Sequence, residues 1–219
     1  MIEKGRPWER PASGPAEWQV EGDDAALAAA VRDRPGARVE FRPAAGSDLA
    51  RALGLHASGT ASLELGLDGL HVVADDRELF AVNMVVVGVA PDRAGRFTRA
   101  PAVRVRVDER VVHDGRATGV VVANGQHLRG ADVVPRGHPG DGRIEIQVYA
   151  VARGERAGVR ARLPQGVHLP HPDITQARGR HVEVRSDGGP VPLEVDGVAV
   201  PPATVVTVDV VPGAFVLVV

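Results

Sequence analysis

The sequence predicts an α+β fold, in which a small α/β layer packs on a large antiparallel β-sandwich or barrel. Two observations support this prediction. Helix signals end at Leu55, and from Gly59 onward apolar and polar residues alternate with a period of two, as in half-buried strands. Asp-Gly pairs, which are typical of hairpin turns, recur between the alternating runs. We therefore expect a mobile N-terminal arm over residues 1–16, the α/β layer over 17–58 and an all-β domain over 59–219.

The α/β layer is predicted as two βα units. A strand at residues 18–20 precedes a turn and a run of strong helix formers at 25–31. A second strand at 39–41 precedes a helix at 48–53, for which Ser47 is a suitable N-cap and Gly54 a suitable C-cap. Two such units cannot bury both faces of their helices, so the layer must pack against the segments that follow.

The remaining residues predict about ten to twelve strands, enough for a sandwich or barrel. The runs at 85–89 and 205–211 are nearly continuous in valine and therefore indicate strands buried on both faces. We expect turns at four Asp-Gly sites, which begin at Asp68, Asp114, Asp187 and Asp196.

Composition excludes several classes of function. The chain has no cysteine, so a disulfide framework and a thiolate metal site are ruled out. A net charge of -2 and few aromatic residues make nucleic acid an unfavourable partner. The longest apolar run, at 79–90, is shorter than the roughly 18 residues of a membrane span. The N-terminus lacks an apolar signal-peptide core, so we expect a cytoplasmic protein, with contact to a membrane surface left open.

One loop contains a candidate site. Asp141 lies between Gly140 and Gly142, just before an alternating strand that begins at Ile144. A carboxylate at a strand start, with the carbonyls of His138 and Arg143, has the oxygen ligands that a hard cation prefers. The same residues are ordinary turn residues, and from their spacing alone the turn is favoured.

Several motifs in this order resemble those of the diacylglycerol kinase and sphingosine kinase superfamily of lipid kinases. The central segment is similar to the family stretch N-x(5)-G-x(4)-P-x-A-x(3)-D-G-x-L-D; its matching residues are Asn124, Gly130, Pro135, Asp141, Gly142, Ile144 and Glu145. Residues 46–54 resemble the G-T-x-N-D-F-A-R-x-L-G helix. Residues 193–197 and 206–218 resemble the D-G-E strand and the closing V-x-P-G-A-L-x-V-L-V signature.

The resemblance implies a nucleotide-binding α/β domain, an all-β lipid domain, and transfer of the ATP γ-phosphate to a lipid hydroxyl with Mg²⁺. It assigns Asp196 as the proton acceptor and Asp141, with the carbonyls of His138 and Arg143, as the Mg²⁺ site. The nucleotide motifs align with Gly22, Asp23, Gly46 and Asp48. For Asp196 the alternative is a residue that only forms an Asp-Gly turn, and we favour the turn.

Three departures from the motifs argue against ATP binding. The phosphate loop G-G-D-G-T is replaced by residues 21–25, where Glu21 and Asp24 add negative charge. Ala45 and Ser47 replace the threonine and asparagine of the second motif, and Val198 replaces the glutamate of D-G-E. Only about twenty residues precede the loop, too few for the βα units with which family members begin, so residues 17–58 are interpreted as a remnant of the nucleotide-binding domain.

The sequence therefore predicts a degenerate member that lacks phosphotransfer and binds a lipid, another apolar molecule or a protein partner. An active lipid kinase completed by self-association or by a separate chain is the alternative. We also expect a homodimer, because a truncated α/β layer would leave apolar surface on its two helices.

Overall fold

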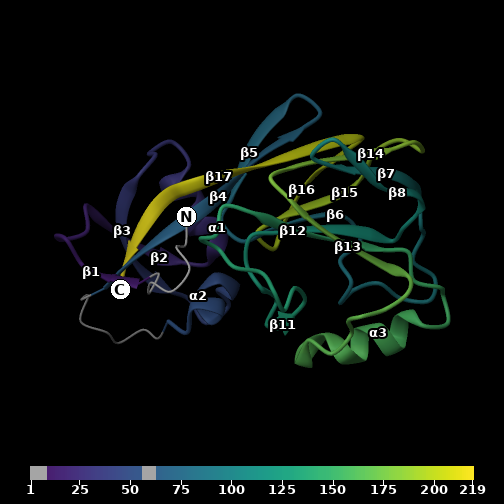
Figure 1. The fold of residues 1–219 in the computed structure, drawn as a ribbon, viewed down its shortest axis with the longest axis horizontal. Helices are drawn as coiled ribbons and strands as arrows, with labels where there is room; N and C mark the ends of the chain where they lie inside the picture. Colours follow the sequence, from purple (N-terminus) through teal and green to yellow (C-terminus); the bar gives the residue numbers. More distant parts are fainter. Residues whose placement is uncertain (1–8, 56–62) are drawn as a thin grey trace.

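The computed structural model describes residues 9–55 and 63–219 (Figure 1). About half of this part of the chain lies in two large sheets, and the remainder includes three short α-helices and a two-stranded hairpin. The predicted α+β class is confirmed. The predicted boundary between residues 58 and 59 lies outside the described residues and stays a prediction.

A nine-stranded sheet forms one side of the molecule. Its main path is β1 (Glu9–Pro11), β4 (Leu63–Ala74), β17 (Val205–Val218), β14 (His181–Ser186), β7 (Ala102–Val107) and β8 (Arg110–Arg116). Three further strands extend it: β2 (Trp18–Gly22) pairs with β3 (Ala37–Pro43), β3 pairs with β17, and β5 (Arg77–Ala81) pairs with β4.

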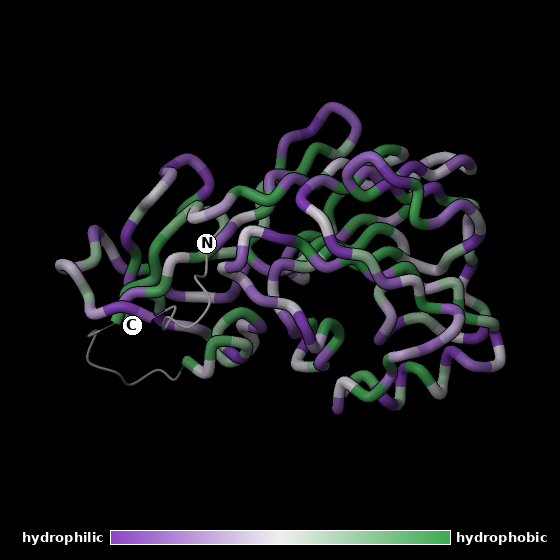
Figure 2. The backbone as a smooth tube through the Cα atoms, in the orientation of Figure 1, coloured by the Kyte–Doolittle hydropathy of each residue, from purple (hydrophilic) through white to green (hydrophobic). Residues whose placement is uncertain are grey.

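A six-stranded sheet packs against it. Its order is β13 (Ile174–Gly179), β12 (Ile144–Tyr149), β9 (Gly119–Ala123), β6 (Met84–Gly88), β15 (Val191–Val195) and β16 (Val198–Ala203). Alternate valine, leucine and isoleucine side chains of both sheets form one buried cluster between them, as expected for a sandwich. Figure 2 shows hydrophobic stretches gathered among these strands, with many hydrophilic stretches in the outer loops.

The α/β layer extends the nine-stranded sheet rather than forming a separate sheet. The strands β2, β3 and the last residues of β17 run parallel to one another. The helices α1 (Asp24–Val31) and α2 (Asp48–Leu53) contribute to a second core, which also contains Phe215 and Leu217 of β17. Ser47 and Gly54 cap α2 as predicted. The strand β17 therefore contributes to both cores (Figure 1).

A third cluster covers the outer face of the six-stranded sheet. Here α3 (Arg156–Arg162), the 3-10 turn η1 (Leu163–Gln165) and the hairpin of β10 (His127–Leu128) and β11 (Ala131–Asp132) contribute apolar side chains. The sequence predicted no helix after residue 55, and α3 shows that this was wrong. The helix has no side-chain N-cap, so the usual start signal is absent. It also contains Gly158, a weak helix former.

Two predicted turns are also wrong. Asp68 lies inside β4 and Asp114 inside β8, whereas the Asp187 and Asp196 sites form turns as expected. Gly69 is needed for packing, since a Cβ atom there would lie 2.2 Å from the Phe80 ring. Part of the predicted mobile arm is paired, because β1 bonds to β4. Among the described residues, no helix is long and apolar enough to cross a membrane.

Candidate functional site

A buried carboxylate, Asp24, lies at the start of α1 beside the N-terminus of α2. The Ser47 hydroxyl donates to its Oδ1 at 2.6 Å, and the Leu49 backbone N–H donates to both oxygens at 3.2 and 3.0 Å. The Asn83 amide donates to Oδ2 at 2.9 Å. Asp24 thus accepts hydrogen bonds from two donors of the α2 N-terminus, where the helix dipole favours an anion.

A second buried carboxylate, Asp196, lies in the turn between β15 and β16. Its oxygens accept three backbone N–H groups, from Val82 at 2.8 Å and from Asn83 and Met84 at 2.9 Å each. Asp196 has a positive φ of 46°, the left-handed conformation of an Asp-Gly hairpin turn. The residue therefore forms the predicted turn and also fixes the start of β6.

Asn83 connects the two carboxylates. Its side chain donates to Asp24 and to the His127 carbonyl, while its backbone N–H donates to Asp196. Asn83 alone thus connects the α/β layer to the turn of the sandwich. We refer to Asp24, Asn83 and Asp196 as the carboxylate cluster.

Burial shifts the titration of both acids. It raises the pKa of Asp24 to about 6, although the Ser47, Leu49 and Asn83 hydrogen bonds lower it. It raises the pKa of Asp196 to about 7, and the nearby Asp24 charge adds to this effect. Two acids whose charges repel across one buried amide both ionise near neutral pH.

These shifts predict a loss of stability with rising pH. A carboxyl whose folded pKa exceeds its unfolded value, near 3.8, stabilises the folded state while protonated. That contribution is lost as the pH rises through about 6 and about 7. The free energy of unfolding should therefore fall by on the order of a few kcal/mol between about pH 4 and pH 8. Urea titrations measure it. In Asp24→Asn the fall should be smaller, and a wild-type stability that rises over this range would contradict the prediction.

The residues aligned with the nucleotide motifs are placed as follows. Asp23 caps α1 by accepting a hydrogen bond from the Ala26 N–H at 3.0 Å. Gly22 has a φ of 140°, and a Cβ atom placed on it would lie only 2.7 Å from the Ala26 Cβ. Asp48 accepts from the backbone N–H groups of Arg129 and Gly130. Gly46 is exposed, and nothing lies within 4 Å of a Cβ built there. Of these four residues, Asp48 is the one whose charge also raises the pKa of Asp24.

The predicted metal loop is built around Asp141. One of its oxygens accepts from the Arg143 backbone N–H at 3.0 Å, and the other forms an ion pair with Arg178. The His138 ring accepts from the Gly140 N–H at 3.2 Å. In residues 9–55 and 63–219, no group of three or more His, Asp or Glu side chains is arranged to hold a metal ion. A cation held by Asp141 and main-chain carbonyls stays a prediction.

A neighbouring carboxylate, Asp68, was missed as a site residue. It is buried in β4 and accepts from the Gly142 N–H at 2.6 Å and the Gly213 N–H at 2.8 Å. Asn124 donates to the Asp68 carbonyl at 2.9 Å and to the Val82 carbonyl at 3.0 Å. Asp68 thereby links the Asp141 loop to the irregular part of β17 around Gly213. The sequence did not indicate this role, because an Asp-Gly pair is typical of a turn.

Comparison with known proteins agrees with this architecture. A family described as the YegS C-terminal NAD kinase beta sandwich-like domain matches residues 61–219. The chain belongs to this family. Membership confirms, for the C-terminal β domain, the resemblance to lipid kinases, and it makes the chain a homologue of diacylglycerol kinase-like and NAD kinase proteins. No curated protein matched the sequence.

Solved structures share the fold of this family member. A putative diacylglycerol kinase from Bacillus anthracis str. Sterne superposes with a TM-score of 0.71 at 14% identity, over 91% of this chain and 76% of that chain. Yeast NADH kinase complexed with NADH gives a TM-score of 0.54 at 14% identity, over 91% and 60%. An NAD kinase from Archaeoglobus fulgidus in complex with ATP gives 0.52 at 13% identity, over 93% and 78%. At these identities the likeness shows the fold alone.

Proposed function

We propose that this family member lacks phosphotransfer activity and that its β domain serves as a ligand-binding module. The observation that carries the proposal is the position of Asp24, which the motif alignment places at a glycine of the phosphate loop. Its carboxylate takes the Ser47 hydroxyl and the Leu49 N–H, donors that would otherwise be free for an anion. An internal carboxylate thus replaces an external phosphate.

Electrostatics supports the same conclusion. Asp24 and Asp48 are buried side by side, and the exposed Glu21 and Asp23 add two further acidic groups on the same loop. A triphosphate would meet repulsion from these groups. Asp196 is buried and held by three backbone N–H groups, so a lipid hydroxyl would have to enter the interior to reach it as a base.

The test is binding of MgATP to the intact protein, measured by calorimetry and by thermal shift. We expect no saturable heat and no rise in melting temperature, since a ligand that binds only the folded state must stabilise it. Asp24→Gly, which restores the motif glycine and frees the α2 donors, is the matched variant. Gain of binding in Asp24→Gly alone would identify Asp24 as the cause, whereas saturable binding to the wild type would refute the proposal.

The alternative is an active lipid kinase completed by self-association or by a separate chain. One observation favours it: the pKa of Asp196 is raised to about 7, near the optimum for a general base at neutral pH. If wild-type protein bound MgATP and transferred phosphate to a lipid, loss of transfer in Asp196→Asn would assign the base.

The homodimer was predicted from apolar surface expected on α1 and α2. Neither α1 nor α2 carries a large hydrophobic side chain that is exposed, and their outward positions are mostly alanine and arginine. The homodimer therefore stays a prediction.

A further inference from the structure

Three side chains that can ligate a metal are placed in one row by the pairing of the nine-stranded sheet. Asp209 of β17 is paired with His181 of β14 on one side and with His71 of β4 on the other. These three strands are neighbours in the sheet (Figure 1). Residues directly opposite each other on antiparallel strands share a face, with Cβ atoms about 4.5–5.5 Å apart. The register therefore sets one imidazole on each side of a carboxylate, and we refer to these three residues as the histidine row.

The histidine row lies on the outer face of the sheet. Side chains alternate between the two faces along a strand, and the next residue along each strand is buried between the two sheets: Val72, Val182 and Val208. The row must therefore face outward. The His181 and Asp209 side chains are 43% and 48% exposed, and His71 is partly exposed. A metal ion can thus reach all three residues from solvent.

Part of a metal site is already assembled in this row. The His181 Nδ1 lies 2.7 Å from the Asp209 Oδ1. A metal ion bound between these two atoms would replace the proton that they share and separate them slightly, because its bonds to nitrogen and oxygen are each about 2.0–2.2 Å long. Among the described residues the His71 ring forms no hydrogen bond or ion pair, so its nitrogens are free to bind.

The third ligand has to turn toward the other two. In residues 9–55 and 63–219, no three His, Asp or Glu side chains already surround a metal position. Exposed side chains change rotamer within nanoseconds, whereas the backbone of the row is fixed by the pairing of three adjacent strands. The site therefore closes on its metal by rotation of partly exposed side chains, without a change in the sheet.

The ligand types select the class of metal. The chain has no cysteine, so metals that need thiolate are excluded. Two imidazoles and one carboxylate suit Zn²⁺, which takes four ligands in a tetrahedron and would keep one position for water. Mg²⁺ prefers ligands that are all oxygen, so it should compete poorly for this row.

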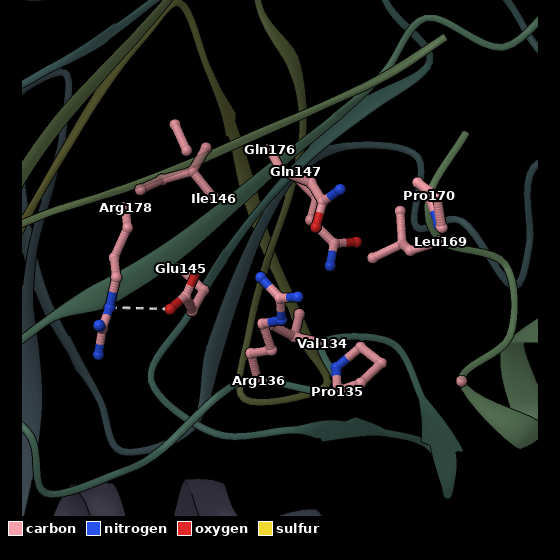
Figure 3. Close-up of a pocket in the computed structure, with 12 residues that line it drawn as sticks. Val134, Pro135, Arg136, Glu145, Ile146, Gln147, Leu169, Pro170, Gln176 and Arg178 are labelled. Carbon is pink, nitrogen blue, oxygen red and sulfur yellow. Dashed lines mark ion pairs between the residues drawn. The ribbon is translucent and has the colours of Figure 1, made fainter. Parts of the chain in front are cut away.

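We propose that the histidine row binds one Zn²⁺ ion through His71, Asp209 and His181. The row shares no residue with the carboxylate cluster or with the Asp141 loop. It also lies on a different sheet from the cavity of about 630 Å³ that is lined by β12, β13 and two loops, at 134–136 and 166–170 (Figure 3). A bound ion would cross-link β4, β17 and β14, and it would stabilise the folded chain by mass action.

The test is calorimetric titration of the full chain with Zn²⁺, repeated in excess Mg²⁺. We expect one Zn²⁺ per chain, an affinity that Mg²⁺ does not change, and a rise in melting temperature. Loss of a residue that only supports a metal ligand costs roughly 10–100-fold in affinity, so His71→Ala and His181→Ala, which each remove a ligand, should weaken binding at least about tenfold. Co²⁺ provides a second readout, because its visible absorption strengthens when imidazoles replace water in a four-coordinate site.

His171→Ala is the matched control, since it removes a partly exposed histidine outside the row. Its ring accepts a hydrogen bond from the Asp173 N–H at 3.1 Å, on the loop before β13. This variant should leave Zn²⁺ affinity unchanged. Melting temperatures without metal check that each variant folds.

Three results would overturn the proposal. The wild type shows no saturable binding of Zn²⁺, His71→Ala binds Zn²⁺ as tightly as the wild type, or His171→Ala weakens binding as much as His71→Ala. The second result would leave only a solvated ion pair between His181 and Asp209, of the kind that contributes little to stability.

Discussion

Replacing Asp196 by alanine is expected to destabilise the protein by about 3–5 kcal/mol, because it leaves three backbone N–H groups without acceptors in the interior. At neutral pH part of this loss is offset, because burial makes ionisation of Asp196 unfavourable and raises its pKa to about 7. The alanine variant does not bear that cost. The largest effect should be at acid pH, where the wild-type acid is protonated and its ionisation costs nothing. Chemical denaturation measures the difference.

Asp114→Ala is the matched control for this substitution. Asp114 lies on exposed β8, and its contact is an ion pair with Arg104 at 2.6 Å, in which both side chains are about half exposed. Such pairs contribute at most about 1 kcal/mol. If the two alanine variants lost equal stability, Asp196 would not anchor the start of β6 as described.

Replacing Phe215 by alanine is expected to cost about 3–5 kcal/mol, the usual range for a phenylalanine in a packed core. Phe215 is fully buried in the core of the α/β layer, on a strand that pairs with both β3 and β4. Phe97→Ala makes the same change at a side chain that is 92% exposed, and it should alter stability by less than about 0.5 kcal/mol.

Hydrogen exchange adds information on where the Phe215→Ala effect acts. Amides of α1, α2 and β3 should lose protection, because their side chains pack in the same core as Phe215. Amides of β12 and β13 belong to the other sheet, so the protection that they owe to local opening should change less. Uniform loss of protection with no difference between these two groups would show that the cores open only together.

Sequence patterns predicted most elements because local chemistry determined them. The α2 helix begins and ends where Ser47 and Gly54 place it, since both caps are made by the residues themselves. The helix α3 could not be found in this way. Its stability comes from burying Arg156 and Val159 against the sheet and loops, and tertiary packing leaves no periodic signal over seven residues.

The site shows the same division. Asp196 and Asp141 were found because their glycine neighbours are conspicuous in the sequence. Asn83 was missed, because its role depends on two carboxylates that lie 59 and 113 residues away along the chain. Asp68 was misassigned, because an Asp-Gly pair has the same appearance in a turn and in the middle of a long strand.

The course of β17 has a consequence for how the protein acquires its fold during synthesis. Both the sandwich core and the core of the α/β layer take side chains from this strand, and its backbone pairs with β3, β4 and β14. It follows every other described element in the chain. A ribosome must therefore release residues 205–218 before either core can close, and until then the nascent chain exposes the unpaired edges of β3, β4 and β14. Chaperones that shield such edges should matter most in this interval.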